Sequence, residues 1–407
     1  MGRSLNIAVC GAGIGGLSAA ALLARQGHSV TLLDQFDAPA PVGSGLMLQV
    51  TGLTILDHLG LADDIRQLGS PLKRLWGLTT PSQRPVLDVR FEHLRAGLVS
   101  YGVQRGLLFD RLLAAATQAG AKLLTSRRVE SVDAKTGDII LETGEFLKGF
   151  DLVVDALGVR SPLTRTPRKE LAYGALWATL PWPADGPFDE TALEQRYKSA
   201  RKMAGVMASG RTASNGPVSL TYFWSIRRDD EAAWRAAPLD DWKREARALW
   251  PETELLLDQV SSHDQLTFAR YRHRTHPDPL GGPRLVHIGD AWHAASPQLG
   301  QGANMALLDA WALSLALEGS EDIPHALARY VALRRNHIRL YQAMSWLFTP
   351  VYQGDSRIMP FLRDWLAAPL TRVPPAPKLL AGMVTGAFGS PLKKLGLNPS
   401  SGATSGP

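Results

Sequence analysis

One stretch of the chain combines residue types that can hold a flat, hydroxyl-bearing small molecule. It runs from Arg284 to Ala310 and reads RLVHIGDAWHAASPQLGQGANMALLDA. Its Gly-Asp pair places the carboxylate of Asp290 at a sharp turn after a short apolar strand, where it can accept hydrogen bonds from sugar-like hydroxyls. Pro297 and the glycines that follow it lead into a helix that we expect to begin near Ala303. The stretch therefore predicts a clamp for a small molecule.

The start of that helix supplies a second kind of chemistry. Its first backbone N–H groups have no partner within the helix, and they carry roughly half a positive charge. A ring that becomes electron-rich would be stabilised against them, beside Asn304 in the first turn. An ordinary strand–loop–helix crossover explains the same pattern, so this stretch alone does not decide between the two interpretations.

A βαβ unit at the start of the chain favours the clamp. The pattern predicts a strand over Asn6–Cys10, a helix over Leu17–Gln26 and a second strand over His28–Asp34. The loop Gly11–Gly16 between them reads GAGIGG, a GxGxxG arrangement that places a dinucleotide pyrophosphate at a helix N-terminus. Asp34 ends the second strand, where its carboxylate can bind an adenosine ribose.

Arg105 is a candidate for binding the phosphates of such a ligand. It begins a predicted helix, Arg105–Gln118, in which Leu108 and Leu112 face the core. That orientation leaves the arginine at the helix entrance, where its guanidinium can reach a phosphate. A capping or surface arginine has the same spacing, so the assignment stays open at this point.

Composition limits the other function classes. The chain has 407 residues, 44 Lys and Arg against 38 Asp and Glu, and a formal net charge of +6. This charge is mild and spread out, which disfavours nucleic acid as a partner. The nearest approach to a basic run, Arg334, Arg335 and Arg339, has helical spacing and is expected on a solvated helix face.

Cysteine usage and apolar runs indicate a cytoplasmic protein. Cys10 is the only cysteine, so the chain has no internal disulfide and no cysteine-based metal site, and we predict no metal. The N-terminus leads directly into a strand rather than into a signal peptide. No apolar run is long enough to span a membrane.

The remaining pattern predicts an α/β fold of two interleaved parts. Strands and a hairpin over residues 121–155 extend the first unit, and a turn at 156–162 is expected on the same side as the first glycine loop. Aromatic-rich strands at Tyr173–Trp182, Met203–Ala208 and Val218–Arg227 predict a second, mainly antiparallel sheet.

We therefore expect a Rossmann-like nucleotide-binding domain, an interleaved β-sheet substrate domain and a C-terminal helical region that opens with Pro324–Phe348. The expected boundaries are 1–72, 101–168 and 281–322 for the three parts of the nucleotide-binding domain, 73–100 and 169–280 for the substrate domain, 323–397 for the helical region and 398–407 for a disordered tail.

With these motifs, residues Asn6–Phe348 resemble the class A flavin-dependent monooxygenases, the family of the para-hydroxybenzoate and ubiquinone-biosynthesis hydroxylases. The glycine loop with Asp34 matches the family's ADP-binding fingerprint, and Arg105–Leu112 matches its R-x-x-L-x-x-x-L segment. Residues Gly289–Asp309 match G-D-A-x-H-x-x-x-P-x-x-G-Q-G-x-N-x-x-x-x-D, the signature of its flavin site.

The resemblance implies a Rossmann-like FAD-binding domain and assigns residues to FAD. Those near the reactive edge of the flavin would be Pro297, Gly300, Gln301 and Gly302, and no general base is assigned. The implied FAD-binding residues are Gly11, Gly13, Ile14, Gly15, Gly16, Asp34, Gln35, Arg105, Gly289, Asp290, Pro297, Gly300, Gly302, Ala303 and Asn304.

The family's reaction gives the expected function. NAD(P)H reduces FAD, O2 adds to form a flavin C4a-hydroperoxide, and one oxygen atom is transferred to a hydrophobic, aromatic or polycyclic small molecule. Two alternatives stay open: a two-component monooxygenase or halogenase reduced by a separate flavin reductase, and a catalytically idle flavin-binding partner protein. A halogenase is disfavoured because the chain has no W-x-W-x-I-P segment.

One motif departs from the family. Where the family has G-A-D-G-x-x-S-x-x-R, residues 155–165 read DALGVRSPLTR, so that Leu157 replaces the middle acid. That segment serves both FAD and NAD(P)H in the family, so direct reduction by a nicotinamide is open unless Asp155 or Arg160 compensates. Trp292 stands where the family often has alanine, and we expect it to fill the core.

Candidates for the substrate pocket come from the second sheet. The pocket is expected between the flavin and that sheet, and strand alternation lets only about half of the candidates point inward. His293 is expected to make a structural hydrogen bond rather than to transfer a proton. The candidate pocket residues are Trp177, Met207, Tyr222, Trp224 and Phe268.

Overall fold

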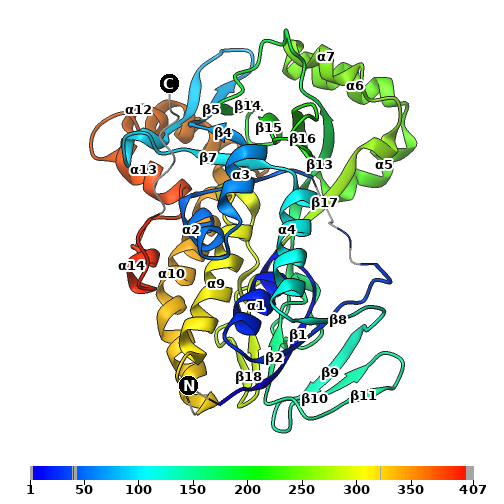
Figure 1. Cartoon of the computed structure of the whole chain (residues 1–407). Coiled ribbons are helices and arrows are strands. Elements are labelled where there is room, and N and C mark those ends of the chain that lie inside the picture. The colour runs from blue at the N-terminus through cyan, green and yellow to red at the C-terminus, as the bar shows by residue number, and fades with distance from the viewer. Residues whose placement is uncertain (1–2, 39, 41–43, 321, 400–407) are drawn as a thin grey trace.

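A mainly parallel six-stranded sheet forms the first half of the computed structural model, which describes residues 3–38, 40, 44–320 and 322–399 (Figure 1). Strand β1 (Asn6–Cys10) lies between β2 (Ser29–Leu33) and β12 (Leu152–Asp155), and both pairings are parallel. The turns after β1 and β12 therefore lie at one edge of the sheet, as predicted. The strand order is β18 (Leu280–Gly282), β19 (Leu285–His287), β12, β1, β2 and β8 (Lys122–Leu124).

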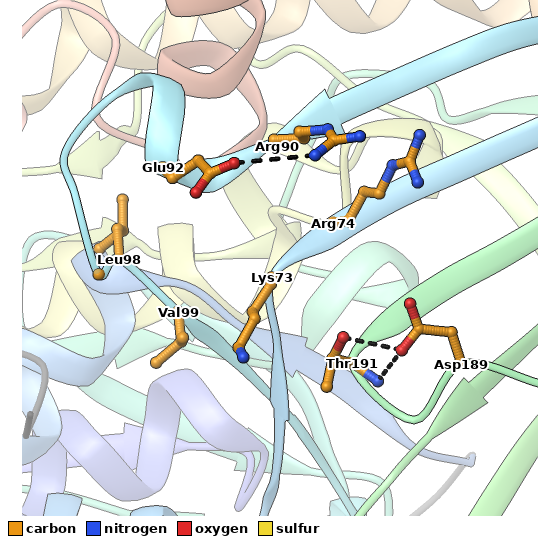
Figure 2. A pocket seen from close by; sticks show the side chains of 9 residues that line it. Lys73, Arg74, Arg90, Glu92, Leu98, Val99, Asp189 and Thr191 are labelled. Carbon is orange, nitrogen blue, oxygen red and sulfur yellow. Dashed lines mark hydrogen bonds and ion pairs between the residues drawn. The ribbon is translucent and has the colours of Figure 1, made fainter. Parts of the chain in front are cut away.

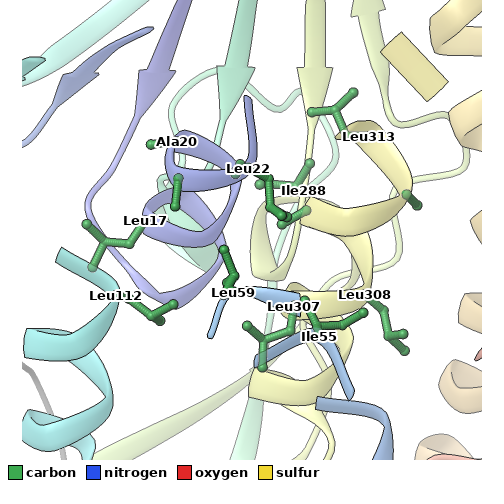
Figure 3. Packing of buried hydrophobic residues seen from close by; sticks show 14 of the residues in the cluster. Leu17, Ala20, Leu22, Ile55, Leu59, Leu112, Ile288, Leu307, Leu308 and Leu313 are labelled. Atoms are coloured by element: carbon green, nitrogen blue, oxygen red, sulfur yellow. The ribbon is translucent and has the colours of Figure 1, made fainter. Parts of the chain in front are cut away.

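Small side chains let the helices on this sheet approach one another closely. The helices are α1 (Ile14–Arg25), α4 (Arg105–Gln118) and α9 (Gly302–Leu317). A Cβ added at Gly15 of α1 would lie only 3.4 Å from the Cβ of Ala306 in α9. Leu17 and Leu22 of α1 and Leu112 of α4 are buried in the same core (Figure 3), which confirms the predicted inward face of α4.

Two three-stranded sheets extend this half. One is the predicted hairpin layer and contains β9 (Val129–Asp133), β10 (Asp138–Leu141) and β11 (Phe146–Leu147). The other contains β3 (Leu46–Leu48), β4 (Ser70–Leu72) and β7 (Ser100–Val103), and the nearby helices are α2 (Val50–His58) and α3 (Ala62–Leu68).

The second half is a seven-stranded sheet that draws strands from distant parts of the chain. The early strands β5 (Arg74–Thr79) and β6 (Pro85–Arg90) join it beside β14 (Ala192–Lys198), which pairs with β5 in parallel. Strand β14 is not expected from the sequence, because the charged residues Glu194 and Arg196 interrupt its apolar pattern although both are buried. The strand order is β17 (Thr267–His273), β13 (Lys169–Pro181), β16 (Ser219–Arg227), β15 (Lys202–Ala208), β14, β5 and β6.

Strand alternation gives this sheet two different faces. On the outer face, Tyr222 and Trp224 of β16 pack edge-on against Trp242. On the inner face, the Oγ1 of Thr221 accepts a hydrogen bond of 3.1 Å from the N–H of Gly45, so this face meets the first half of the fold. The helices of the outer layer are α5 (Glu231–Ala236), α6 (Leu239–Leu249) and α7 (Glu254–Leu257).

The long C-terminal helix corrects one prediction. Helix α10 (Ile323–Tyr352) carries the three arginines expected on a solvated face, but Arg334 is fully buried and its Nε donates a hydrogen bond of 2.7 Å to Asp309. Arg339 is exposed, as predicted. Helical spacing alone does not show that α9 presents a buried carboxylate to α10.

Short helices follow α10; α12 and α13 lie at one end of the molecule, and α14 lies beside α10 (Figure 1). Residues 400–407, most of the predicted disordered tail, lie outside the described residues. Within the described part of the chain, no helix is long and apolar enough to cross a membrane. The short helices are α11 (Ile358–Leu362), a π-helical turn (Arg363–Ala367), α12 (Ala368–Leu370), α13 (Ala376–Val384) and α14 (Pro391–Lys394).

Candidate functional site

The loop after β1 has the geometry that a dinucleotide needs. Gly11 has a φ of +105°, and a Cβ there would lie 2.6 Å from the carbonyl oxygen of Ala156. A Cβ on Gly16 would lie 1.9 Å from the carbonyl oxygen of Gly11, so these two glycines keep the loop and α1 in close contact. A Cβ on Gly13 would meet no atom within 4 Å, which leaves open space at the N-terminus of α1.

Asp34 lies beside that loop, directly after β2. Its Oδ2 accepts a hydrogen bond of 2.8 Å from the N–H of Ala12, and its Oδ1 accepts one of 3.0 Å from the N–H of Phe36. Each carboxylate oxygen has a further lone pair, so the side chain keeps acceptor capacity for a ribose hydroxyl. Ile14 is the first residue of α1, and Gln35 is exposed next to Asp34.

Arg105 and Asp290 form the second part of the site. Arg105 begins α4, and its Nε is buried without a hydrogen-bond partner among the described residues. Asp290 is exposed and begins α8 (Asp290–His293) after Gly289, whose φ is +57°. Desolvation by the surrounding protein raises the pKa of Asp290, while the nearby charges of His293 and Arg105 oppose that shift. The carboxylate of Asp290 is therefore accessible to a ligand and lies near the charge of Arg105.

A buried carboxylate holds the turn that carries Asp290. Asp309 accepts hydrogen bonds from the N–H of Gly289 at 2.8 Å, from Nε2 of His293 at 2.6 Å and from Nε of Arg334 at 2.7 Å. Burial opposes ionisation of Asp309, but the charges and hydrogen bonds of His293 and Arg334 prevail and lower its pKa to about 2. The expected structural hydrogen bond of His293 is confirmed.

No individual role was expected for Asp309, although the sequence around it carries a signal. It is the only charged residue in α9, whose sequence is GANMALLDAWALSLAL. A lone acid inside an apolar helix indicates a buried and paired carboxylate, because an unpaired buried charge is very costly.

The turn before α9 is the candidate flavin edge. Pro297 is exposed, Gly300 has a φ of +62°, and a Cβ on Gly302 would meet no atom within 4 Å. Helix α9 begins at Gly302, one residue earlier than predicted, so its free N–H groups face this opening. Gln301 is buried and donates from Nε2 to the carbonyl of Val384 at 2.5 Å, while its Oε1 has no partner among the described residues.

Asn304 ties this turn to the segment between β3 and α2. Its side chain is fully buried. Its Oδ1 accepts a hydrogen bond of 2.9 Å from the N–H of Gln49, and its Nδ2 donates to the carbonyl of Met47 at 3.1 Å and to the side chain of Gln49. The side chain therefore positions the turn, and the backbone N–H of Asn304, like that of Ala303, is the group left for a ligand.

Two connections join the turn to the inner face of the second sheet. Gln298 donates from Nε2 to Oε1 of Gln353 at 3.1 Å, and Gln353 donates from Nε2 to the carbonyl of Gly174 in β13 at 3.2 Å. On the other side, Met47 lies against Gly300 and belongs to the same buried cluster as Met207 of β15. The candidate flavin edge therefore lies beneath the inner face.

Comparison with known proteins now identifies the family. The FAD binding domain family model matches residues 4–143 and 185–343. The chain belongs to the class A FAD-dependent monooxygenases. The expected family, the α/β fold class and the assignment as an oxidoreductase are thereby confirmed.

Named relatives cover most of this monooxygenase. A putative 2-heptyl-3-hydroxy-4(1H)-quinolone synthase from Rhodococcus erythropolis is 29% identical over 83% of this chain and 86% of its own length. The 6-hydroxynicotinate 3-monooxygenase of Bordetella bronchiseptica is 28% identical over 79% of this chain and 85% of its own length.

Solved structures share the fold. A 2-methyl-3-hydroxypyridine-5-carboxylic acid oxygenase has a TM-score of 0.78 at 22% identity and covers 96% of this chain and 98% of its own. Klebsiella pneumoniae HpxO, solved with FAD and uric acid, has a TM-score of 0.75 at 20% identity and covers 94% of this chain and 96% of its own.

The residues of this monooxygenase fit FAD. The open glycine Gly13 suits a pyrophosphate, and the unpartnered Nε of Arg105 suits a phosphate oxygen. Asp290 is free to accept hydrogen bonds from hydroxyls, and the open space at Gly302 suits a flat ring next to the amides of α9. Each part of the cofactor thus has a matching group at the same edge of the first sheet.

The predicted substrate wall needs correction at three positions. Tyr222 and Trp224 belong to the buried cluster of the outer face, and Phe268 packs against that cluster. Helices α5 to α7 cover this face, so these three side chains point away from the flavin edge. The alternation of side chains along a strand decides the face to which each one points. Aromatic character alone did not show which face of the sheet the helices cover.

Trp177 and Met207 remain as inner-face candidates, and Phe223 joins them. The ring of Trp177 stacks on that of Phe223 with centroids 5.4 Å apart, and both pack in an inner-face cluster with Met203. Trp292, by contrast, fills the core as expected, since it is buried and its Nε1 donates to the carbonyl of His276 at 3.1 Å.

The turn that departs from the family motif is held by Asp155. Its Oδ2 accepts hydrogen bonds from Oγ of Ser161 at 2.6 Å and pairs with Nδ1 of His287 at 2.7 Å, and its Oδ1 accepts the N–H of Leu157 at 3.0 Å. Asp155 is fully buried and engaged, so it does not compensate for Leu157 as a cofactor ligand. Arg160 is exposed at the same turn.

A surface hollow also lies away from this site. It has a volume of about 390 Å³, and Lys73, Arg74, Arg90, Glu92 and Asp189 contribute to its lining (Figure 2). A hollow next to it shares Arg74 and Asp189. Both lie on the β5 side of the second sheet, and their mixed charges distinguish them from the apolar inner face.

Proposed function

We propose that this monooxygenase inserts one oxygen atom from O2 into a hydrophobic, aromatic small molecule, with FAD as cofactor and NAD(P)H as electron donor. The observation that carries the proposal is the position of the turn Pro297–Gly302 beneath the inner face, to which Met47 and Gln298 connect it. The inner face presents Trp177 and Met207 there. Relatives named for hydroxynicotinate, aminohydroxybenzoate and urate support an aromatic substrate class.

The protein groups have separable roles in this proposal. FAD, when bound, supplies the redox chemistry that activates O2. Arg105 would bind the phosphates, and Asp290 would accept hydrogen bonds from ribityl hydroxyls. The backbone N–H groups at the start of α9 would stabilise negative charge on the reduced ring without reorganisation. Trp177 and Met207 would orient the substrate and keep water away from the reacting atoms.

Arg274 supports direct reduction by NAD(P)H. It follows β17, it is buried, and its Nε and Nη1 have no hydrogen-bond partner among the described residues. Burial lowers the pKa of Arg274, the charge of Asp155 opposes that shift, and Arg168 adds to it. A buried guanidinium with free donors would be satisfied by the diphosphate of a nicotinamide nucleotide. Arg274 is therefore our candidate for compensating Leu157.

Mixing FAD-loaded protein with NADH or NADPH in air tests the proposal. Bleaching of the flavin absorbance followed by reoxidation is expected, and 18O2 should label the product of 3-amino-4-hydroxybenzoate, 6-hydroxynicotinate or a related ring compound. No bleaching unless a separate flavin reductase is added would instead establish the two-component alternative.

Because Cys10 is a free thiol, a reducing cytoplasm is the proposed compartment.

A further inference from the structure

The helices after α10 expose an apolar stripe. Phe361, Trp365 and Leu366 are each 60% exposed. With their neighbours they recur every three or four residues, the spacing of one face of a helix. Such a face normally packs on the core, but here it points to solvent. This C-terminal stripe consists of Ile358, Phe361, Leu362, Trp365, Leu366 and Leu370, all of them exposed.

The opposite face of the same segment carries the polar anchor. Arg363 is only 2% exposed and donates to the carbonyls of Val351 and Ser199, each at 3.2 Å. Its guanidinium also lies 5.1 Å from the ring centroid of Tyr197. An arginine therefore points inward while a tryptophan and a phenylalanine point outward. The hydrogen bonds of Arg363 fix this orientation of the helix. The apolar side chains of the stripe are therefore held at the surface.

Positive charge surrounds the stripe. Residues 357–397 contain six Lys or Arg and a single acid, Asp364. Five of the six cations are exposed, and the sixth is the buried Arg363. Asp364 is paired with Arg363 at 2.6 Å. Arg372 and Lys378 are exposed and have no salt bridge within the described ranges. The guanidinium of Arg84 lies 3.5 Å over the ring of Trp365, which adds a cation at the edge of the stripe.

We propose that the C-terminal stripe docks this monooxygenase on the surface of an anionic lipid bilayer. Exposed Trp, Phe and Leu beside Lys and Arg match a segment that lies in the membrane interface, with its apolar side among the acyl chains and its cations at lipid phosphates. The stripe is too short to span a bilayer. A second copy of the chain fits less well, because a twofold contact would bring two like-charged surfaces together.

Vesicle sedimentation with the purified holoenzyme tests this proposal. Vesicles of phosphatidylcholine with phosphatidylglycerol should carry the protein down at low salt, and vesicles of phosphatidylcholine alone should bind it at least about tenfold more weakly. The double variant Phe361→Ser/Leu366→Ser should weaken binding about tenfold or more, because it removes two inserted apolar side chains. The double variant Arg372→Glu/Lys378→Glu should abolish the preference for the anionic lipid.

A matched control is available on another surface. Phe146 is 58% exposed. Its strand, β11, lies at the opposite end of the molecule from α12 and α13 in Figure 1, so Phe146→Ser should leave vesicle binding unchanged. Equal binding to both vesicle types, or no binding to either, would overturn the proposal. A change of molecular mass on light scattering in the Phe361→Ser/Leu366→Ser variant would also overturn the proposal, because the C-terminal stripe would then bind a second copy of the chain. None of these readouts depends on the oxygenation reaction.

Discussion

The carboxylate of Asp309 in α9 lies 2.7 Å from Nε of Arg334 in α10, and both side chains are completely buried. The same carboxylate accepts the N–H of Gly289 and a hydrogen bond from His293. One ion pair therefore joins the cofactor-binding turn to the C-terminal helical region. A substitution that breaks this ion pair should therefore lower both the stability of the protein and its affinity for FAD.

Replacing Asp309 with asparagine should cost about 3–5 kcal/mol in the free energy of unfolding, because Arg334 would keep a buried charge without a counter-ion. FAD affinity should fall as well, since the turn before Asp290 loses its anchor. Denaturant titration and flavin titration of the same preparation measure the two effects. The double variant Asp309→Asn/Arg334→Met should recover part of the stability; no recovery would argue against the ion pair as the cause.

His337 predicts how stability depends on pH. Burial, together with the neighbouring charge of Arg334, lowers the pKa of His337 from 6.5 to about 2. Below pH 6.5 the unfolded chain therefore binds a proton that the folded chain does not, so stability falls as the pH falls through this window. The loss should approach about 1.4 kcal/mol per pH unit below pH 6, or roughly 2 kcal/mol by pH 5.

Urea denaturation of FAD-saturated protein between pH 7 and 5 measures this slope. The variant His337→Gln retains an acceptor for Nη1 of Arg334, which donates to Nδ1 of His337 at 3.0 Å. This variant should lack the contribution of His337 to the slope. Identical slopes in both proteins would contradict the assignment. The carboxylate of Asp309, with its pKa lowered to about 2, contributes only at lower pH.

Replacing Asp290 with alanine should give folded protein that binds FAD at least about tenfold more weakly, a loss of roughly 1.4 kcal/mol. The reason is the loss of the exposed hydrogen-bond acceptor near Arg105. Equilibrium dialysis against FAD provides the measurement. Asp110 is exposed on α4 and serves as the control, since Asp110→Asn should retain full affinity. Full flavin retention by Asp290→Ala would count against its role.

The two faces of the second sheet predict opposite outcomes for neighbouring side chains. Met207→Ala should raise KM or lower the product formed per NAD(P)H consumed, because Met207 lies on the inner face. Tyr222→Phe should leave both unchanged. It should not lower stability, because the hydroxyl of Tyr222 is buried without a hydrogen-bond partner in the described structure. A turnover defect confined to Tyr222→Phe would reverse the assignment of the faces.

Arg274→Met should slow reduction of the flavin by NADH and NADPH at least about tenfold, as expected for the loss of a charge-assisted contact. Reduction by dithionite should be unaffected, because that reagent needs no nucleotide site. Stopped-flow absorbance records both rates. Equal slowing with the two reductants would instead point to a disturbed flavin environment.

Local patterns in the sequence were sufficient for much of this fold. The glycines at 11–16 and Asp34 predicted the first βαβ unit, and Leu108 and Leu112 predicted the buried face of α4, because short-range steric and hydrophobic periodicity decide such elements. The signature from Gly289 to Asp309 predicted the turn and the helix that carry the candidate flavin edge. These features depend on residues close together in the chain.

Only the tertiary structure decided which residues far apart in the sequence contact one another. It placed Arg334 against Asp309 rather than in solvent, and it placed Tyr222 and Trp224 beneath α6 rather than over the flavin edge. It also added β14 to the second sheet, where the charged residues of this strand are buried and β5 is its parallel neighbour. A side chain's own pattern shows that it must be covered or paired. Which distant surface provides the cover or the counter-charge depends on long-range packing, and no local pattern records it.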